Sequence, residues 1–371
     1  MFVKYKMNVF CKTIFVINFF ALLSDAFTDD LCKNNVSCVV LEDCETLHAL
    51  IHQNNSFNVI NLLKELHCGF DSGDRPKYCC SRDLKNSTVN SYYSNNPVYL
   101  LPDFKICGIQ YNDRIVGGTQ TDIDEHPWMA LLQYKIYKRN LFVCGAVLIS
   151  SKYVLTAAHC VVGEQISKNW KLTKVRLGEW NVTSKIDCYG EDCSPPVLDI
   201  PVEEIIPHTD YNPKDRNRLN DIALIRLVNE VEFNDFVKPI CLPISKELRS
   251  KSFDGYTMEV AGWGQTESWH SSEVKMKVRV PVVKNDKCQD IYSKEGKILT
   301  EKQICAGGLE GQDSCRGDSG GPLMGQVPGI ENWIVTGIVS YGPNPCGTIG
   351  FPSIYTKVTS YVDWILSNIR P

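Results

Sequence analysis

The sequence predicts an all-β protein that carries a small disulfide-rich domain at its N-terminus and a helix at its C-terminus. Three observations predict this class. Short β-rich runs separated by turn signals follow residue 115, six cysteines crowd into residues 32–80, and apolar residues near the end recur at helical spacing. Because the 371 residues are 43% hydrophobic and 22% charged, the chain can bury a sizeable core.

Charge and cysteine content exclude some functions. The formal net charge of -4 argues against a nucleic-acid partner, since such proteins usually carry a basic excess. Seventeen cysteines exceed ordinary cytosolic usage, and the C-x-x-C pairs that are typical of zinc sites are missing. We therefore expect disulfides and an oxidising compartment.

The first 26 residues have the layout of a secretory signal peptide. Three lysines precede an apolar run at residues 14–23, and a small-x-small cleavage site, Ser24-Asp25-Ala26, follows it. The run is shorter than the roughly 20 residues that span a bilayer, so we expect a secreted, extracellular protein without a membrane partner. Removal of Cys11 leaves an even sixteen cysteines for pairing. Four sequons predict N-glycosylation, at Asn35, Asn54, Asn86 and Asn181.

Residues 31–80 form the first predicted domain. A segment of this length buries little core and usually needs covalent crosslinks. Its cysteines are Cys32, Cys38, Cys44, Cys68, Cys79 and Cys80. Apolar residues between Cys44 and Cys68 predict one or two short amphipathic helices. Residues 81–114 are polar and rich in Asn, Ser and Pro, which indicates a linker and activation segment.

Residues 115–371 form the second predicted domain. We expect strands at Trp128–Tyr134, Phe142–Ile149, Lys174–Leu177, Asp221–Leu227, Thr257–Ala261, Val278–Val283 and Trp333–Val339. The terminal helix is predicted from the spacing of Val358, Tyr361, Val362, Ile365 and Ile369.

Three short segments of this second domain carry candidate chemistry. They are Leu155-Thr156-Ala157-Ala158-His159-Cys160, Asn220-Asp221-Ile222-Ala223-Leu224 and Gly317-Asp318-Ser319-Gly320-Gly321-Pro322. Acyl transfer to a serine needs a base to take the hydroxyl proton and a carboxylate to orient that base. We assign Ser319 as nucleophile, His159 as base and Asp221 as the orienting group. The peptide N–H groups of Gly317 and Ser319 are the candidate oxyanion donors.

Together with Ile115-Val116-Gly117-Gly118 and Gly262-Trp263-Gly264, these segments resemble the trypsin/chymotrypsin-like serine proteases. The resemblance covers Ile115 to about Ile369. It implies a double β-barrel with the active site between the barrels, a C-terminal helix, and endopeptidase activity that needs no cofactor.

The resemblance also implies a zymogen. Cleavage of the Arg114–Ile115 bond by an upstream protease would free the α-amino group of Ile115. In the family, this new cation is buried and pairs with the carboxylate that precedes the nucleophile, which is Asp318 here. Loss of one partner of such a buried pair typically costs about 3–5 kcal/mol, enough to couple cleavage to ordering of the oxyanion loop.

The resemblance also implies which substrates are cut, through one charged residue. The match to trypsin puts Asp313 at the floor of the primary pocket, with Ser314 beside it and Gly342 as an open wall. A carboxylate there would attract Arg or Lys and reject apolar side chains. The family usually has glycine where this chain has Ser353, so selectivity between Arg and Lys stays open.

Cysteine spacing completes the resemblance. Residues 32–80 resemble the clip domain of arthropod proteases, with an adjacent final cysteine pair. The implied bonds are Cys32–Cys79, Cys38–Cys68, Cys44–Cys80, Cys107–Cys241, Cys144–Cys160, Cys188–Cys193, Cys288–Cys305 and Cys315–Cys346. Family members act in haemolymph cascades, where they activate prophenoloxidase or process the cytokine-like precursor of the Toll ligand, and serpins inhibit them. The clip domain is either a docking module or a spacer.

Two alternatives remain open. A clip protein can be a non-catalytic adaptor, although such adaptors typically lose the nucleophile that Ser319 provides. In the acidic loop after Leu177, Glu179, Asp187 and the Asn181 carbonyl offer oxygen ligands for a structural Ca²⁺ ion. The other interpretation is a solvated acidic loop.

Overall fold

A computed structural model describes residues 37–45, 47–48, 63, 66–71, 75–80, 97–110, 119–162, 169–266 and 270–371. Contacts divide the chain into two compact units, Met1–Tyr99 and Leu100–Pro371. Several predictions lie outside the described residues. They are the signal peptide, the Arg114–Ile115 bond, the Cys32 half of one disulfide, and the sequons at Asn35, Asn54 and Asn86. No helix in the described part of the chain is long and apolar enough to cross a membrane.

The first unit contains a small antiparallel sheet in the order β1-β3-β2. Its elements are β1 (Ser37–Val40), η2 (Leu41–Asp43), β2 (His67–Phe70) and β3 (Pro76–Cys80). The Cys38–Cys68 and Cys44–Cys80 bonds tie these segments together, and Leu47 is fully buried beside Cys44. The helices predicted between Cys44 and Cys68 fall mostly outside the described residues. The sequence analysis did not predict these three strands, because four or five residues show too little alternation of apolar and polar side chains to indicate a strand.

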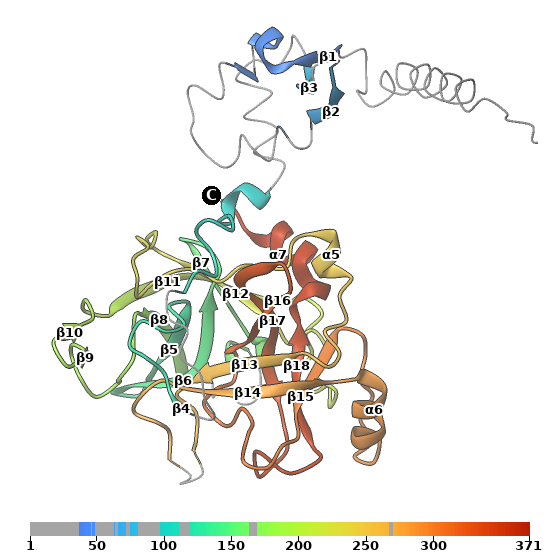
Figure 1. Cartoon of the computed structure of the whole chain (residues 1–371). Helices are drawn as coiled ribbons and strands as arrows, with labels where there is room; N and C mark the ends of the chain where they lie inside the picture. The colour runs from blue at the N-terminus through green and yellow to red at the C-terminus, as the bar shows by residue number, and fades with distance from the viewer. Residues whose placement is uncertain are drawn as a thin grey trace, which may run out of the picture. The chain divides into compact units, whose positions relative to one another are not determined.

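The second unit begins with a closed six-stranded barrel in the order β11-β12-β7-β6-β5-β8 (Figure 1). The strands are β5 (Met129–Ile136), β6 (Arg139–Leu148), β7 (Tyr153–Thr156), β8 (Trp170–Leu177), β11 (Leu198–Pro207) and β12 (Ala223–Leu227). All residues of β12 are buried, including Arg226, which interrupts an otherwise apolar run and pairs with Glu203. A short hairpin has two residues in each strand, β9 (Cys188–Tyr189) and β10 (Asp192–Cys193). The Cys188–Cys193 disulfide joins its two strands.

A second barrel follows in the order β13-β16-β17-β18-β15-β14, and it closes because β13 also pairs with β14. Its strands are β13 (Thr257–Gly262), β14 (Met276–Val283), β15 (Gln303–Gly307), β16 (Pro322–Val327), β17 (Ile330–Tyr341) and β18 (Pro352–Lys357), and β4 (Thr119–Gln120) extends the β14 edge. The helical segments are η3 (Pro97–Leu100), η4 (Ala158–Cys160), α5 (Lys246–Arg249), α6 (Asn285–Ser293), η5 (Val358–Tyr361) and α7 (Val362–Asn368).

One apolar core spans both barrels and runs from Trp128, just before β5, to Met324 and Ile338 of the second barrel. The Trp128 indole N–H lies 3.1 Å from the Met324 sulfur and points toward it across this boundary. A second core, which includes Val280, Ile304 and Tyr355, lies within the second barrel. Val362 and Ile365 of α7 are buried, and the terminal helix is confirmed, with its first turn tightened into η5. The all-β, two-barrel expectation is therefore confirmed.

Five disulfides crosslink the second unit. They are Cys107–Cys241, Cys144–Cys160, Cys188–Cys193, Cys288–Cys305 and Cys315–Cys346, the same pairs that the family resemblance implies. Their partners lie up to 134 residues apart in the sequence.

Candidate active site

Neighbouring strands bring the first two candidate catalytic groups together. His159 lies in η4, just after β7, and Asp221 lies just before β12. Because β7 and β12 pair antiparallel, with Ala223 opposite Thr156, the end of one strand meets the start of the other. The apolar residues that bury these strands thus also position the two polar side chains.

His159 and Asp221 form a two-point contact. The His159 ring donates from Nδ1 to Asp221 Oδ2 at 2.7 Å, and its backbone N–H donates to Oδ1 at 2.8 Å. Burial by itself raises the pKa of Asp221, but the contacts with His159 outweigh burial and hold the pKa below its usual value. An ionised Asp221 keeps the proton on Nδ1 and leaves Nε2 free to act as a base.

Two further groups donate hydrogen bonds to Asp221, and the sequence analysis predicted neither of them. Ser340 of β17 donates its hydroxyl to Asp221 Oδ2 at 2.5 Å. Thr356 of β18 donates to the Asp221 carbonyl oxygen at 2.7 Å. The available signal was the Ser340-Tyr341-Gly342 segment at the end of an apolar strand, next to the predicted pocket wall.

Ser319 shares a cavity with His159. Both line a space of about 460 Å³, together with Gly317 and Gly342. In the described part of the chain, no hydrogen bond joins the Ser319 hydroxyl to His159, whose Nε2 lies 3.7 Å from Cys160 Sγ. Unliganded sites often show such loose geometry. The Gly145 N–H donates to the Ser319 carbonyl at 2.8 Å and ties the nucleophile's turn to β6.

The oxyanion turn depends on glycine at one position. Gly317 has a φ of +105°, and a Cβ there would lie 2.9 Å from Gly264 Cα. A side chain is therefore excluded by both strain and space. This conformation keeps the backbone next to Ser319 free of side-chain bulk where the N–H donors are needed.

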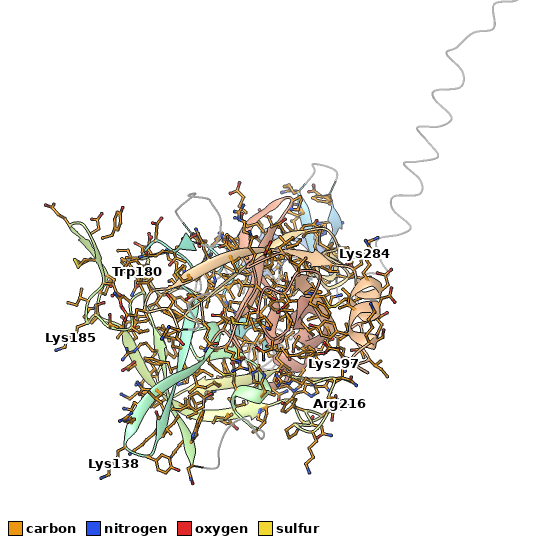
Figure 2. The ribbon with its side chains drawn as sticks, turned by 90° about the horizontal axis from the view of Figure 1, so that it is seen from below. Lys138, Trp180, Lys185, Arg216, Lys284 and Lys297 are labelled. Carbon is orange, nitrogen blue, oxygen red and sulfur yellow. A yellow bond between two sulfur atoms is a disulfide. The ribbon has the colours of Figure 1, made fainter. Side chains whose placement is uncertain are left out.

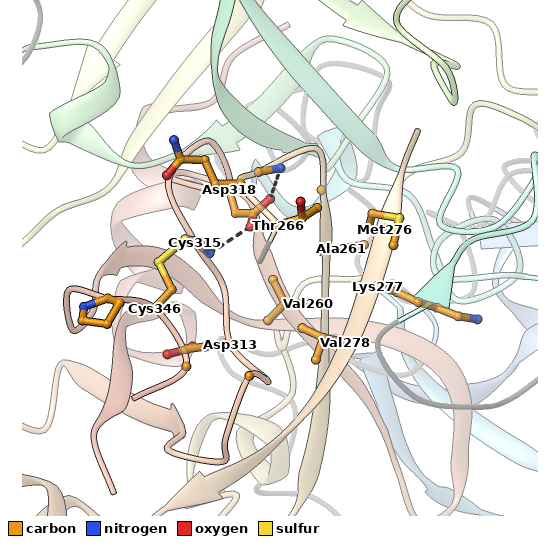
Figure 3. A pocket seen from close by; sticks show the side chains of 16 residues that line it. Val260, Ala261, Thr266, Met276, Lys277, Val278, Asp313, Cys315, Asp318 and Cys346 are labelled. Atoms are coloured by element: carbon orange, nitrogen blue, oxygen red, sulfur yellow. Dashed lines mark hydrogen bonds between the residues drawn. A yellow bond between two sulfur atoms is a disulfide. The ribbon is translucent and has the colours of Figure 1, made fainter. Parts of the chain in front are cut away.

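Asp318 faces a second cavity, of about 620 Å³ (Figure 3). Its carboxylate accepts the N–H groups of Gly264 at 2.8 Å and Cys315 at 3.0 Å. Burial raises its pKa to about 6. Asp313 lines the same cavity, and its negative charge interacts with Asp318. Lys277 also lines this cavity but pairs with Glu125, so the two carboxylates make the cavity favourable for a cation.

The predicted specificity pocket has an unexpected floor. Ser353, Ser314 and Gly342 line the catalytic cavity, whereas Asp313, predicted at its floor, lines the cavity that Asp318 faces and contacts the catalytic cavity through Ser353. The Ser353 hydroxyl donates to Asp313 Oδ2 at 2.8 Å, and the Ser314 N–H donates to Oδ1 at 2.8 Å. Burial nevertheless raises the pKa of Asp313 to about 6. A cation entering from the catalytic cavity therefore meets the Ser353 hydroxyl before the carboxylate.

The acidic loop after Leu177 is internally paired. Glu179 accepts from Arg176 Nη1 and the Trp180 N–H, each at 3.0 Å. Asp187 accepts the N–H groups of Trp180 and Asn181, at 3.0 and 3.1 Å. Buried Lys275 interacts electrostatically with both carboxylates. Since N–H donors and cations already satisfy these oxygens, the loop does not fit a Ca²⁺ site, which needs oxygens converging on one point.

The Asn181 sequon adopts a compact turn on this loop. The Asn181 side-chain oxygen accepts the N–H of Thr183 at 3.0 Å and its hydroxyl at 2.7 Å. Thr183 is exposed. Glycosylation of Asn181 stays a prediction.

A two-barrel fold with a His–Asp pair and a serine on one cavity defines a trypsin-like serine endopeptidase. Family comparison agrees with this class. Residues 115–365 match the Trypsin family, and residues 32–80 match the regulatory CLIP domain of proteinases. The chain belongs to the clip-domain serine proteases of the trypsin family.

Similar proteins have the same two-domain architecture. The chain is 54% identical over 342 residues to CLIP domain-containing serine protease HP8 of Bombyx mori, covering 91% of this chain and 93% of that protein. It is 38% identical to Phenoloxidase-activating factor 1 of Holotrichia diomphalia, covering 99% and 100%. A solved structure, the Grass clip serine protease of the Toll pathway from Drosophila, matches with a TM-score of 0.63 and 34% identity, covering 89% and 93%.

Proposed function

We propose that the protein is a secreted zymogen which, after cleavage of Arg114–Ile115, cuts proteins after Arg or Lys in an extracellular haemolymph cascade. One observation carries this proposal: the His159–Asp221 pair, Ser319 and the Ser353 floor backed by Asp313 converge on one cavity. The relatives' shared domain architecture supports the zymogen and the cascade.

The chemistry follows from the positions of these groups. His159 Nε2 takes the proton from the Ser319 hydroxyl as its oxygen attacks the substrate carbonyl. The N–H groups of Gly317 and Ser319 hold the oxyanion, and His159 returns the proton to the leaving amine. Water then repeats the sequence and releases the acyl group. Asp221 stays ionised and holds the imidazole in place throughout.

Activation follows from the cavity that Asp318 lines. An α-amino group has a reference pKa near 8, so it is cationic at neutral pH. Pairing with Asp318 would offset the desolvation of that carboxylate and hold the loop of residues 315–319 in its catalytic shape. An upstream protease that recognises Arg114 is thus one required partner, and a serpin is the expected inhibitor.

The leading substrate is prophenoloxidase, with the precursor of the Toll ligand as the alternative. The likeness to a phenoloxidase-activating factor supports the first, and the likeness to a Toll-pathway protease supports the second. The test is to cleave the zymogen at Arg114, incubate it with each candidate and map the cut bonds. We expect one cut after Arg in prophenoloxidase. Cleavage of the other precursor alone would select the alternative, and cleavage of neither would contradict the cascade role.

Ser353 is expected to lower the preference for Arg over Lys. Its hydroxyl already donates to Asp313 Oδ2, so it competes with a guanidinium for that oxygen in the two-point fork geometry that a guanidinium prefers. An ammonium needs only one oxygen and can use the hydroxyl as well. Ser353→Gly should therefore raise the ratio of kcat/KM for arginyl over lysyl amides by roughly tenfold.

Ser353→Ala is the matched control for that change, because it removes the hydroxyl but keeps a methyl group. If alanine changes the Arg-over-Lys ratio as much as glycine does, the hydrogen bond from Ser353 to Asp313 sets that ratio. If only glycine changes the ratio, the size of the side chain at position 353 sets it. An unchanged ratio in both variants would show that Ser353 does not govern selectivity.

A further inference from the structure

A third cavity, of about 600 Å³, adjoins the catalytic one and has a strongly basic lining. Four cationic side chains line it, and we call it the basic cavity: Lys214, Arg216, Arg218 and Lys297. Three come from the loop before Asp221, and Lys297 comes from the segment after α6, about 80 residues later. Figure 2 shows Arg216 and Lys297 on the same side of the domain. The full chain has a net charge of -4, so this concentration of positive charge is local.

Acidic groups do not neutralise this cavity. Asp215 is the single carboxylate among its described lining residues, and it accepts the backbone N–H groups of Asn217 and Leu219 at 3.0 and 3.1 Å. Glu295 lies 3.9 Å from Lys297, at the limit of an ion pair. Burial lowers the pKa of Lys297, the charge of Glu295 raises it, and the nearby charges of Arg218 and Arg216 lower it. An incoming anion would relieve that repulsion.

Two of the cations are held against the wall of the catalytic cavity. Arg218 Nη1 donates to the Ser340 carbonyl at 2.8 Å, and its guanidinium lies 5.6 Å from the Tyr341 ring centre. Lys297 Nζ lies 3.9 Å from the same ring centre. The Tyr341 ring therefore positions two cations at the point where the cavities join.

The route of the substrate connects the two cavities. His159, Arg218, Tyr341 and Gly342 line both. If the basic side chain of a substrate passes Gly342 toward Ser353, a neighbouring part of the substrate reaches the basic cavity over Tyr341, which lines both cavities. Val143 and Cys144 line only the catalytic cavity, and we assign that end to the residues that follow the cut. The basic cavity is then left to the residues that precede the cut.

We propose that the basic cavity selects protein substrates with an acidic side chain one to three residues before the scissile Arg or Lys. This inference rests on the proposed protease function and adds a substrate class to it. Charge complementarity at a partly exposed site mainly raises the association rate and weakens with salt. Replacement of a neutral residue by an acidic one should therefore raise kcat/KM by roughly tenfold at low ionic strength.

The test uses the zymogen cleaved at Arg114 and peptide amides with a fixed arginine. Glu, Gln or Lys is placed at each of the three positions before that arginine and, separately, at the two positions after it. We expect Glu to exceed Gln and Gln to exceed Lys before the arginine, with the difference shrinking in high salt. Equal rates for Glu and Gln, or a gain confined to positions after the arginine, would overturn the proposal.

Variants of the exposed cations give the matched comparison. Arg216→Glu and Lys214→Glu should each reduce the Glu-over-Gln ratio several-fold. Lys185→Glu makes the same charge change on the opposite side of the domain in Figure 2 and should leave the ratio unchanged. An equal loss in all three would show a non-local charge effect and contradict the proposal. A single-residue arginyl amide reports the catalytic function separately: if it is not cleaved, the protease function fails, whatever the peptides show.

Discussion

Ser319→Ala and His159→Ala are each expected to lower kcat of the cleaved enzyme by roughly a millionfold, and the double variant should lose no more. The two groups act in one proton transfer, so the removal of either disables the other. Asp221→Asn should cost about ten-thousandfold, because an amide hydrogen-bonded to Nδ1 favours the wrong tautomer. The measurement is hydrolysis of a small arginyl amide after cleavage at Arg114.

Folding must be separated from chemistry in these variants. Each should show the wild-type thermal unfolding midpoint to within a few degrees, and Ser319→Ala should resist labelling by a serine-directed organophosphonate. A small arginyl substrate cleaved at near wild-type rate by Ser319→Ala would refute the catalytic assignment. An additive loss in the double variant would mean that Ser319 and His159 act in different steps.

Asp318→Asn should abolish activation without preventing cleavage at Arg114. The new α-amino cation would then meet a neutral amide in the cavity, and the pairing that organises the oxyanion turn would be lost. The loss of one oxyanion donor alone costs about a hundredfold to a thousandfold, so we expect kcat/KM to fall by at least about a hundredfold. Normal activity in the cleaved variant would contradict the role of Asp318.

The same variant should change the pH dependence of zymogen stability. Burial raises the folded-state pKa of Asp318 from 3.8 to about 6. Its contribution to stability is therefore fully present below pH 3.8 and is lost as the pH rises through 6. A shift of this size corresponds to about 3 kcal/mol at most, so we expect the free energy of unfolding to fall by about 1–3 kcal/mol over this window.

Denaturant unfolding of the uncleaved zymogen at pH 4, 5, 6 and 7 measures this slope. Asp313 titrates in the same direction, so the informative quantity is the difference between wild type and Asp318→Asn. Asp363→Asn changes an 87% exposed carboxylate and is the matched control, because exposed ion pairs contribute little. Identical slopes in wild type and Asp318→Asn would show that the carboxylate is already solvated or paired in the zymogen.

Much of the fold could be predicted from local patterns. All seven predicted strands exist, as β5, β6, β8, β12, β13, β14 and β17, because each carries apolar residues that are buried. Other strands of the described part, among them β7, β11, β15, β16 and β18, were not predicted. Strands β16 and β18 each follow a turn that contains glycines, and their sequences resemble loops. In the clip unit, the cysteines predicted a crosslinked domain, but its three strands are too short to show a period.

Part of the candidate site could likewise be predicted from the sequence, and part could not. Motifs of a few residues identified Ser319, His159 and Asp221, because this chemistry restricts which residues can stand beside each group. The interpretation of Glu179 and Asp187 as Ca²⁺ ligands does not fit, because Arg176 of β8 donates to Glu179, and Lys275, just before β14, interacts electrostatically with both carboxylates. The hydroxyl of Ser340 donates to Asp221 from 119 positions away, and its signal in the sequence was the Ser340-Tyr341-Gly342 segment alone.

By itself, the sequence determined the domain composition, seven of the strands and the three catalytic residues, since each of these depends on a short local pattern or motif. Only the tertiary structure decided that Ser353 covers Asp313, that Lys297 joins Arg216 and Arg218, and that Asp318 faces a cavity. These features are electrostatic, and electrostatic energies depend on distance and solvent exposure, which a chain acquires only when it folds.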